Sequence, residues 1–145
     1  MKAIIGVIIF SLALLLSGSA MAADTFKDPA AMKKFGDEFM GKVGTADLKA
    51  AYKILRPYVS MNDVEFDAGI NESNKARQQN AMQYGPVKGY EFVREMKVGT
   101  VVYGLDYLEI TEKQALVWSF SFIKAGDTWR LDEFYWNDRS SMLFN

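Results

Sequence analysis

The chain has 145 residues, and its 17 basic and 18 acidic side chains leave a formal charge of −1 at pH 7. A nearly neutral chain of this kind lacks the electrostatic footprint of a protein that binds nucleic acid or anionic lipid. It contains no Cys and no His, which excludes disulfides, thiolate zinc sites and every Ser–His or Cys–His catalytic arrangement. Any catalysis would therefore have to use carboxylates, tyrosines or lysines.

The first 22 residues have the composition of an export signal. Lys2 supplies a positive start, and residues 3–16 form an apolar run that is shorter than the about 20 residues a membrane span needs. Ala20 and Ala22 stand at the −3 and −1 positions of an A-x-A cleavage site. The alternative is an uncleaved membrane anchor. We expect a signal peptide that is cleaved near Ala22, which releases the protein into the periplasm or the medium with no membrane span.

Residues 23–145 suit one domain with a single hydrophobic core. After a loose lead-in over 23–27, Asp28 and Pro29 indicate a helix start, because Asp can accept from early backbone N–H groups and Pro at the first position loses no hydrogen bond. An apolar stripe at helical spacing follows and ends at Gly44. Its members are Met32, Phe35, Phe39 and Val43.

Two more helices are expected before the sheet. Thr45 is expected to cap the second, which stops near Arg56 because Pro57 follows. The third covers about 63–83, is largely exposed on one side, and ends at Gly85.

The pattern then changes from helical spacing to runs rich in aromatic and β-branched residues. Four strands are expected, at about 89–97, 100–111, 115–124 and 128–138. The breaks between them are short, which forces adjacent antiparallel pairing. The apolar phase of the last run slips at Asp132 and Glu133, which predicts a β-bulge and a sharp bend.

Three helices followed by a bent antiparallel sheet, ending in ALVWSFSFIKAGDTWRLDEFYWND, resemble the NTF2-like (cystatin-like α+β cone) superfamily, and in particular its small exported bacterial members. The residues that carry the resemblance are Gly85, Tyr90, Val98, Gly99, Trp118, Phe120, Phe122, Gly126, Asp127, Trp129, Leu131, Phe134 and Trp136. The resemblance implies an α+β cone with three helices on four strands, and often a homodimer. The superfamily includes enzymes, ligand carriers and dimerisation modules, so its fold leaves function open.

The aromatic residues of the sheet are the candidate binding residues. They either form the core under the helices or line a pocket or a dimer face. The candidates for contact with a small apolar ligand are Tyr103, Tyr107, Trp118, Phe120 and Trp136.

Asp106 is the candidate for catalysis, because Asp is a poor strand former and burial would raise its pKa. Beside Tyr103 or Tyr107 it would resemble the Asp-plus-Tyr arrangement of ketosteroid isomerase, a member of the same superfamily. Those tyrosines, however, have odd numbers and Asp106 an even one, so in one flat strand they face opposite ways. A position at an edge or facing solvent is the competing interpretation, and Arg130 could then pair across strands with Asp106 or with Glu133.

No metal or cofactor is expected. Asp63, Glu65 and Asp67 superficially resemble a calcium loop, but Ala68 and Asn74 occupy the positions that require Gly and an acid. The residues favour a non-catalytic module that binds a small apolar ligand or a partner protein. An isomerase or dehydratase-like enzyme that uses Asp106 with a tyrosine is the alternative.

Overall fold

The structure, a computed structural model, describes residues 8–11 and 22–144. The elements in chain order are β1 (Ile8–Ser11), α1 (Pro29–Val43), α2 (Leu48–Leu55), the 3₁₀ turn η1 (Arg56–Tyr58), α3 (Asp63–Gln79), α4 (Ala81–Tyr84), β2 (Val87–Val98), β3 (Val102–Thr111), β4 (Ala115–Ala125), β5 (Thr128–Asn137) and η2 (Ser140–Phe144). The α+β class and the four antiparallel strands after residue 85 are confirmed.

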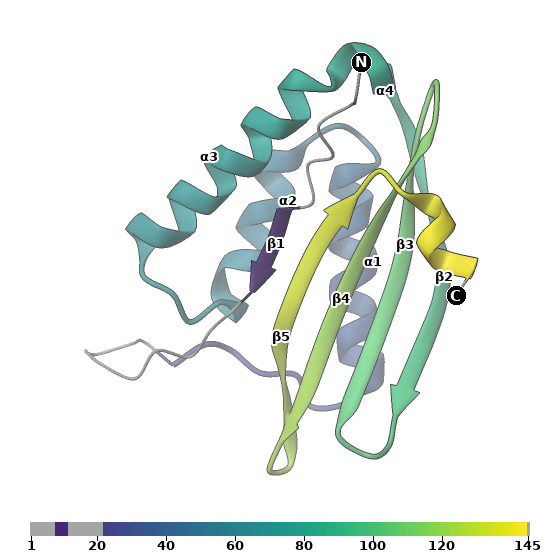
Figure 1. Ribbon diagram of the computed structural model, residues 1–145. Helices are drawn as coiled ribbons and strands as arrows, with labels where there is room; N and C mark the ends of the chain where they lie inside the picture. The colour runs from purple at the N-terminus through teal and green to yellow at the C-terminus, as the bar shows by residue number, and fades with distance from the viewer. Residues whose placement is uncertain (1–7, 12–21, 145) are drawn as a thin grey trace.

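The strands form one sheet in the order β1-β5-β4-β3-β2, with every neighbouring pair antiparallel. In Figure 1, helices α1 and α2 lie behind this sheet, and α3 lies beyond its β1 edge. The turn η2 follows β5 and lies toward the β2 edge. Below, the face of the sheet that α1 covers is called the inner face, and the opposite one the outer face. Within the described residues, no helix is long and apolar enough to cross a membrane.

The predicted bulge in the last strand is confirmed. Ser121 pairs with Glu133, and the next residue, Phe122, pairs with Leu131, so Asp132 is the extra residue of β5. This shift lets both halves of β5 direct apolar side chains to the inner face, because Leu131 and Phe134 are both buried.

The N-terminal part of the domain departs from the prediction at two points. The segment over 23–27 is not a loose lead-in, because Phe26 is buried and exchanges two backbone hydrogen bonds of 2.7 Å with Trp129. The cap of α2 is Asp47, whose side chain accepts from the Ala50 N–H, whereas the hydroxyl of Thr45 donates back to carbonyls of α1.

The single helix expected over 63–83 is two helices, α3 and α4, divided at Asn80. The Asn80 side chain donates to the Ala76 carbonyl over 2.8 Å, and its own backbone has left helical geometry. Asn side chains compete in this way for backbone groups, which explains the break. The end of the helical region at Gly85 is as predicted, with a positive φ of 74°.

The strand β1 was not expected, because it lies inside the predicted signal peptide. Its four residues pair with β5 from Glu133 to Trp136. The remainder of that predicted segment up to residue 21 lies outside the described residues.

The predicted stripe of α1 is buried against the inner face. The Phe39 ring centroid lies 5.3 Å from that of Trp118 and 5.2 Å from that of Phe120, both edge to face. Phe35 meets Phe120 in the same way at 5.7 Å. Such contacts add to the stability that burial alone provides.

Gly36 allows α1 to approach the sheet, which gives a first prediction. A Cβ at this position would lie 2.4 Å from the hydroxyl oxygen of Tyr107. We expect Gly36→Ala to lower the free energy of unfolding by about 1–3 kcal/mol, because overpacking exceeds the helix-propensity gain of about 0.5–1 kcal/mol. Urea denaturation measures the change.

The matched control is Gly41→Ala, in the same helix, where a Cβ would meet no atom within 4 Å. This variant should be as stable as the parent or slightly more stable. Adding Tyr107→Phe to Gly36→Ala removes the clashing oxygen and should restore part of the loss. Equal effects of the two glycine substitutions would contradict the packing argument.

Candidate functional site

The five aromatic residues predicted to bind a ligand all lie on the inner face and are at most 2% exposed. They come from three adjacent strands. Tyr107, Trp118 and Trp136 stand opposite one another in one row across β3, β4 and β5. Phe120 and Tyr103 follow in the next rows toward the other end of the sheet.

These rings contact other side chains and do not border either of two open hollows on the molecule. The rings of α1 cover Trp118 and Phe120, and Phe92 of β2 meets Tyr107 at 5.3 Å. The hollows lie along α1, beside Glu38 and Ile54, and none of the five aromatic residues lines them. The structure therefore uses the aromatic set as core.

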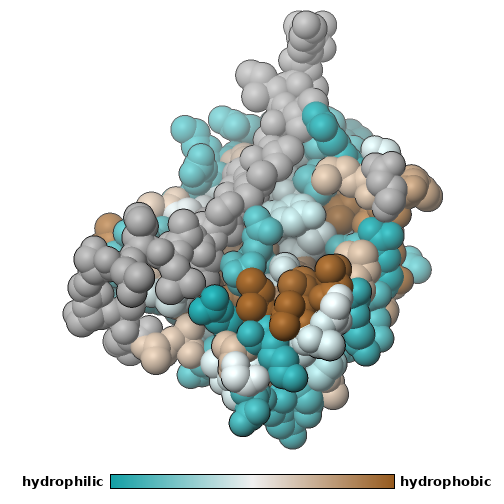
Figure 2. Space-filling view, turned by 60° about the horizontal axis from the view of Figure 1, so that its bottom comes forward, coloured by the Kyte–Doolittle hydropathy of each residue, from teal (hydrophilic) through white to brown (hydrophobic). Residues whose placement is uncertain are grey.

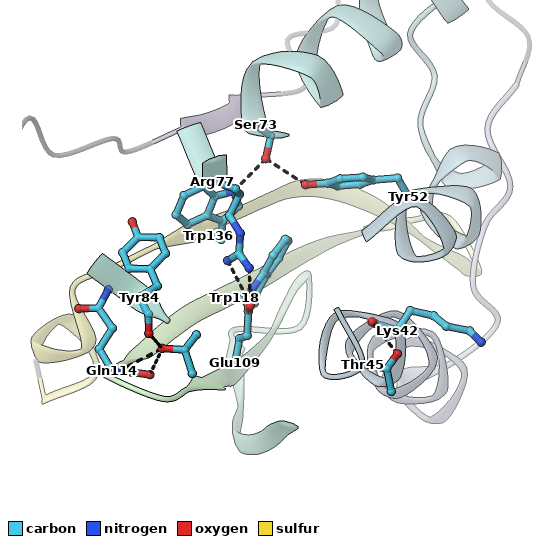
Figure 3. A network of polar contacts seen from close by, with 11 residues as sticks. Lys42, Thr45, Tyr52, Ser73, Arg77, Tyr84, Glu109, Gln114, Trp118 and Trp136 are labelled. Carbon is cyan, nitrogen blue, oxygen red and sulfur yellow. Dashed lines mark hydrogen bonds and ion pairs between the residues drawn. The ribbon is translucent and has the colours of Figure 1, made fainter. Parts of the chain in front are cut away.

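A polar network lies at the end of the inner face that α3 covers (Figure 3). Its centre is Glu109 of β3, whose side chain is 0% exposed. The carboxylate accepts from Trp118 Nε1 over 2.8 Å and from Arg77 Nη1 over 2.7 Å, and Arg77 Nη2 donates to its other oxygen. Three N–H groups thus engage this buried carboxylate, and two of them come from one guanidinium.

The second part of the network is centred on Ser73, one turn before Arg77 in α3. Trp136 Nε1 donates to the Ser73 hydroxyl over 2.9 Å, and the Tyr52 hydroxyl of α2 lies 2.9 Å from the same oxygen. Burial raises the pKa of Tyr52, so this phenol stays protonated at neutral pH. The guanidinium of Arg77 also lies over the Trp136 ring, 5.2 Å from its centroid.

This network attaches α3 to the sheet. Only Phe66 and Ser73 of that helix are fully buried, so polar contacts carry much of its attachment. Both oxygens of the Glu109 carboxylate already accept hydrogen bonds from Arg77 or Trp118. This arrangement holds α3 in place and leaves neither oxygen without a partner for a substrate. Among the residues described, no cluster of three or more acidic side chains could hold a metal ion.

Sequence reasoning named Trp118 and Trp136 but missed Glu109, Ser73 and Arg77, although part of the signal was present. Glu109 continues the odd-numbered series Tyr103, Leu105, Tyr107 and therefore has the parity of the inner face. In α3, Phe66, Ile70, Ser73 and Arg77 follow one another at helical spacing. A carboxylate on one buried face and a cation on another indicate an ion pair once the two elements are known to pack.

Asp106 is on the outer face and does not meet either candidate tyrosine. It is 4% exposed, and it accepts from Arg94 Nε over 2.8 Å and from the Ser119 hydroxyl over 2.7 Å. Its cationic partner is thus Arg94 of β2, and the expected partner Arg130 stands beside Ile123 instead. Arg94 Nη1 also donates to the carbonyl of Leu143, which attaches η2 to this face.

The two candidate tyrosines have buried rings whose hydroxyls reach carboxylates at the rim of the inner face. Tyr107 donates to Asp37 Oδ1 over 3.0 Å, and Tyr103 donates to Glu95. Burial first, and then these carboxylates, raise the pKa of both phenols well above the ordinary value. Both hydroxyls are therefore protonated donors with an acceptor in place.

The inner face is thus an aromatic core that ends in one buried ion pair, and its phenols bond to carboxylates at the rim. Comparison with known proteins finds no family model, no curated protein and no solved structure that matches this chain.

Proposed function

We propose that the protein is a non-catalytic interaction module of the NTF2-like kind, which acts in the periplasm after cleavage near Ala22 and pairs with a second copy through the outer face of its sheet. The observation that carries the proposal is the distribution of apolar side chains. The inner face is filled by the rings of its own core, whereas the outer face of β2 and the turn after it remain apolar and exposed.

The exposed apolar residues of this region are Met96 at 40%, Val98 at 65% and Val101 at 52%. Met96 and Val98 have the parity of Arg94, which bonds Asp106 on the outer face, and they pair with Gly104 and Val102 of β3. The Met96 side chain lies over Gly104, since a Cβ on that glycine would be 3.5 Å from its methyl group. We call Met96, Val98 and Val101 the outer apolar patch.

The other end of the outer face is covered by the chain itself, where Arg94 binds η2. Figure 2 brings the lower end of the molecule forward, where the β2–β3 and β4–β5 turns lie, and shows a compact hydrophobic group among polar residues. Exposed apolar groups with a polar surround are typical of protein–protein contact sites. A symmetric pair of copies would bury the patch against itself.

A small apolar ligand is the second candidate, and one observation favours it. Helix α3 has 17 residues, buries only two of them and is attached largely by the polar network, so displacing α3 from that network would open the inner face. A ligand would then contact Trp118 and Trp136 beside the polar network. The enzyme alternative has less support, because Asp106 already accepts hydrogen bonds from Arg94 and Ser119. It also lies on the opposite face of the sheet from Tyr103 and Tyr107.

Light scattering on the protein recovered from the periplasm tests the proposal. The parent, sequenced from its N-terminus, should begin at Ala23, and its mass should be twice that of one chain. Val98→Asp should reduce the protein to a monomer, because the charge would be buried unpaired in the interface. The matched control is Val64→Asp on α3, where the parent Val is 80% exposed and lies outside the patch.

The control should remain a dimer. A monomeric parent, or a Val98→Asp protein that stays dimeric, would overturn pairing through the outer apolar patch. A thermal-shift screen of lipophilic compounds on the Val98→Asp protein addresses the ligand candidate separately, since that substitution leaves α3 and the inner face unchanged.

A further inference from the structure

When β1 is set aside, the sheet of residues 23–145 has two edges, β2 and β5, which differ in composition and regularity. The β2 edge is protected against pairing with another strand, because register shifts interrupt it between Val87 and Gly89 and again between Phe92 and Arg94. Charged side chains are spread along it. They are Lys88, Glu91, Arg94, Glu95 and Lys97. Bulges and charges of this kind are the devices by which proteins prevent edge-to-edge association.

The β5 edge lacks these devices from Phe134 to Trp136. Its pairing with β4 is regular from Glu133 to Asn137, and Phe134, Tyr135 and Trp136 form an uncharged aromatic run. Nearer the start of β5, the chain closes the edge itself, because Phe26 and Trp129 exchange backbone hydrogen bonds. The stretch from Glu133 to Trp136 is the part of this edge that Phe26 does not cover.

In the full chain that strand is β1. Ile8, Ile9, Phe10 and Ser11 pair antiparallel with Trp136, Tyr135, Phe134 and Glu133, in this order and without a register shift. Figure 1 shows β1 beside β5, on the side of α3. The occupant therefore comes from outside the domain expected over 23–145. An edge strand supplied by a separate segment can be exchanged for another of similar sequence.

We propose that Glu133–Trp136 of β5 is a strand-accepting site, which binds an extended apolar segment rich in β-branched and aromatic residues. Ile8–Ser11 fills it in the full chain, and a segment of this composition from a partner protein fills it once the leader is removed. The second statement rests on the proposed cleavage. The site would be selective for segments without proline at alternate positions, because every second residue of an antiparallel strand supplies both its backbone N–H and its C=O to the ladder.

Hydrogen exchange read by mass spectrometry tests the intramolecular pairing. The backbone N–H groups of Phe134 and Trp136 face β1, because those of Glu133 and Tyr135 face their partners Ser121 and Ser119 in β4. Their partners Phe10 and Ile8 therefore supply the ladder bonds, so Phe10→Pro in the full chain removes one of these N–H groups and should disrupt β1.

The amides of Phe134 and Trp136 should then exchange at least about tenfold faster, the change that 1.4 kcal/mol of local stability produces. Leu15→Pro, in the same apolar run but outside β1, is the control and should leave them unchanged. The amides of β3 provide an internal reference for global stability.

A peptide added in trans tests the site itself. Residues 7–12, Val-Ile-Ile-Phe-Ser-Leu, flanked by lysines for solubility, should slow exchange at Phe134 and Trp136 of the Phe10→Pro chain by about tenfold. The same peptide with proline at its Phe10 position should have no effect. Val98→Asp added to the chain should not change the result, so failure of the proposed dimer would leave this site intact.

Unchanged exchange at Phe134 and Trp136 in the Phe10→Pro chain would overturn the proposal, and so would equal protection by the two peptides. Protection that spreads to β2 would place the peptide on the other edge and equally contradict the assignment.

Discussion

Arg77→Leu is expected to lower the free energy of unfolding by about 3–5 kcal/mol, the usual consequence of removing one partner of a buried ion pair. Glu109 has no exposed surface, and Arg77 supplies two of its three hydrogen bonds. Without the guanidinium, one indole N–H remains for a buried carboxylate. Urea denaturation followed by tryptophan fluorescence measures the loss, and Trp118 and Trp136 report on the site directly.

The matched control is Lys34→Leu, which removes a cation that is 78% exposed and pairs with Glu38 at 3.8 Å. It should change stability by less than about 1 kcal/mol. Adding Glu109→Leu to Arg77→Leu removes the stranded charge and should recover a large part of the loss. If the double variant is as unstable as Arg77→Leu with Glu109 kept, the penalty does not come from the unpaired carboxylate.

The free energy of unfolding is expected to fall steeply as the pH rises above about 10, because several phenols are held protonated by the fold. Burial first, and then the neighbouring Asp138, raise the pKa of Tyr84 to about 12. The Tyr84 hydroxyl donates to that carboxylate over 3.3 Å. Burial and the rim carboxylates raise the pKa of Tyr103 and Tyr107 in the same direction.

The sign of the effect follows from the protons that each state binds. An unfolded tyrosine loses its proton near pH 10, whereas folded Tyr84 keeps it until about pH 12. Between these values the folded state binds more protons, so stability decreases with rising pH by about 1.4 kcal/mol per pH unit for each such tyrosine. Below about pH 10 both states are protonated, and the contribution of the neutral phenols is fully present.

Denaturation midpoints measured between about pH 9 and 12 test this expectation. Tyr84→Phe should reduce the slope by one proton in this range, and Tyr90→Phe, at a phenol whose side chain is partly exposed on the edge strand, serves as the comparison. A Tyr84→Phe protein whose pH dependence equals that of the parent would contradict the assignment.

Local patterns were sufficient to predict the parts of the fold that depend on neighbouring residues. The Asp28 cap, the end of the helical region at Gly85 and the bulge at Asp132 are all confirmed. Each depends on backbone preferences and on the period of the side chains within a few residues. The break at Asn80 depends on one side chain that competes for a helical carbonyl, a signal that the weak periodicity of α3 did not reveal.

The candidate site depended on contacts between distant parts of the chain. The alternation of β3 correctly put Asp106 and the two tyrosines on opposite faces, but it could not show that Arg94 is the partner of Asp106. Nor could it show that Arg77 meets Glu109.

By itself, the sequence determined the α+β class, the four antiparallel strands β2 to β5 after the helices, and which aromatic side chains share the inner face. These follow from periodicity and turn chemistry, which act over a few residues. The tertiary structure alone decided that the aromatic set is filled core, that α3 is attached by a buried ion pair, and that β1 pairs with β5. The physical reason is that ion pairs and edge pairing depend on which surfaces the packed elements bring together, and many different partners satisfy the same local pattern.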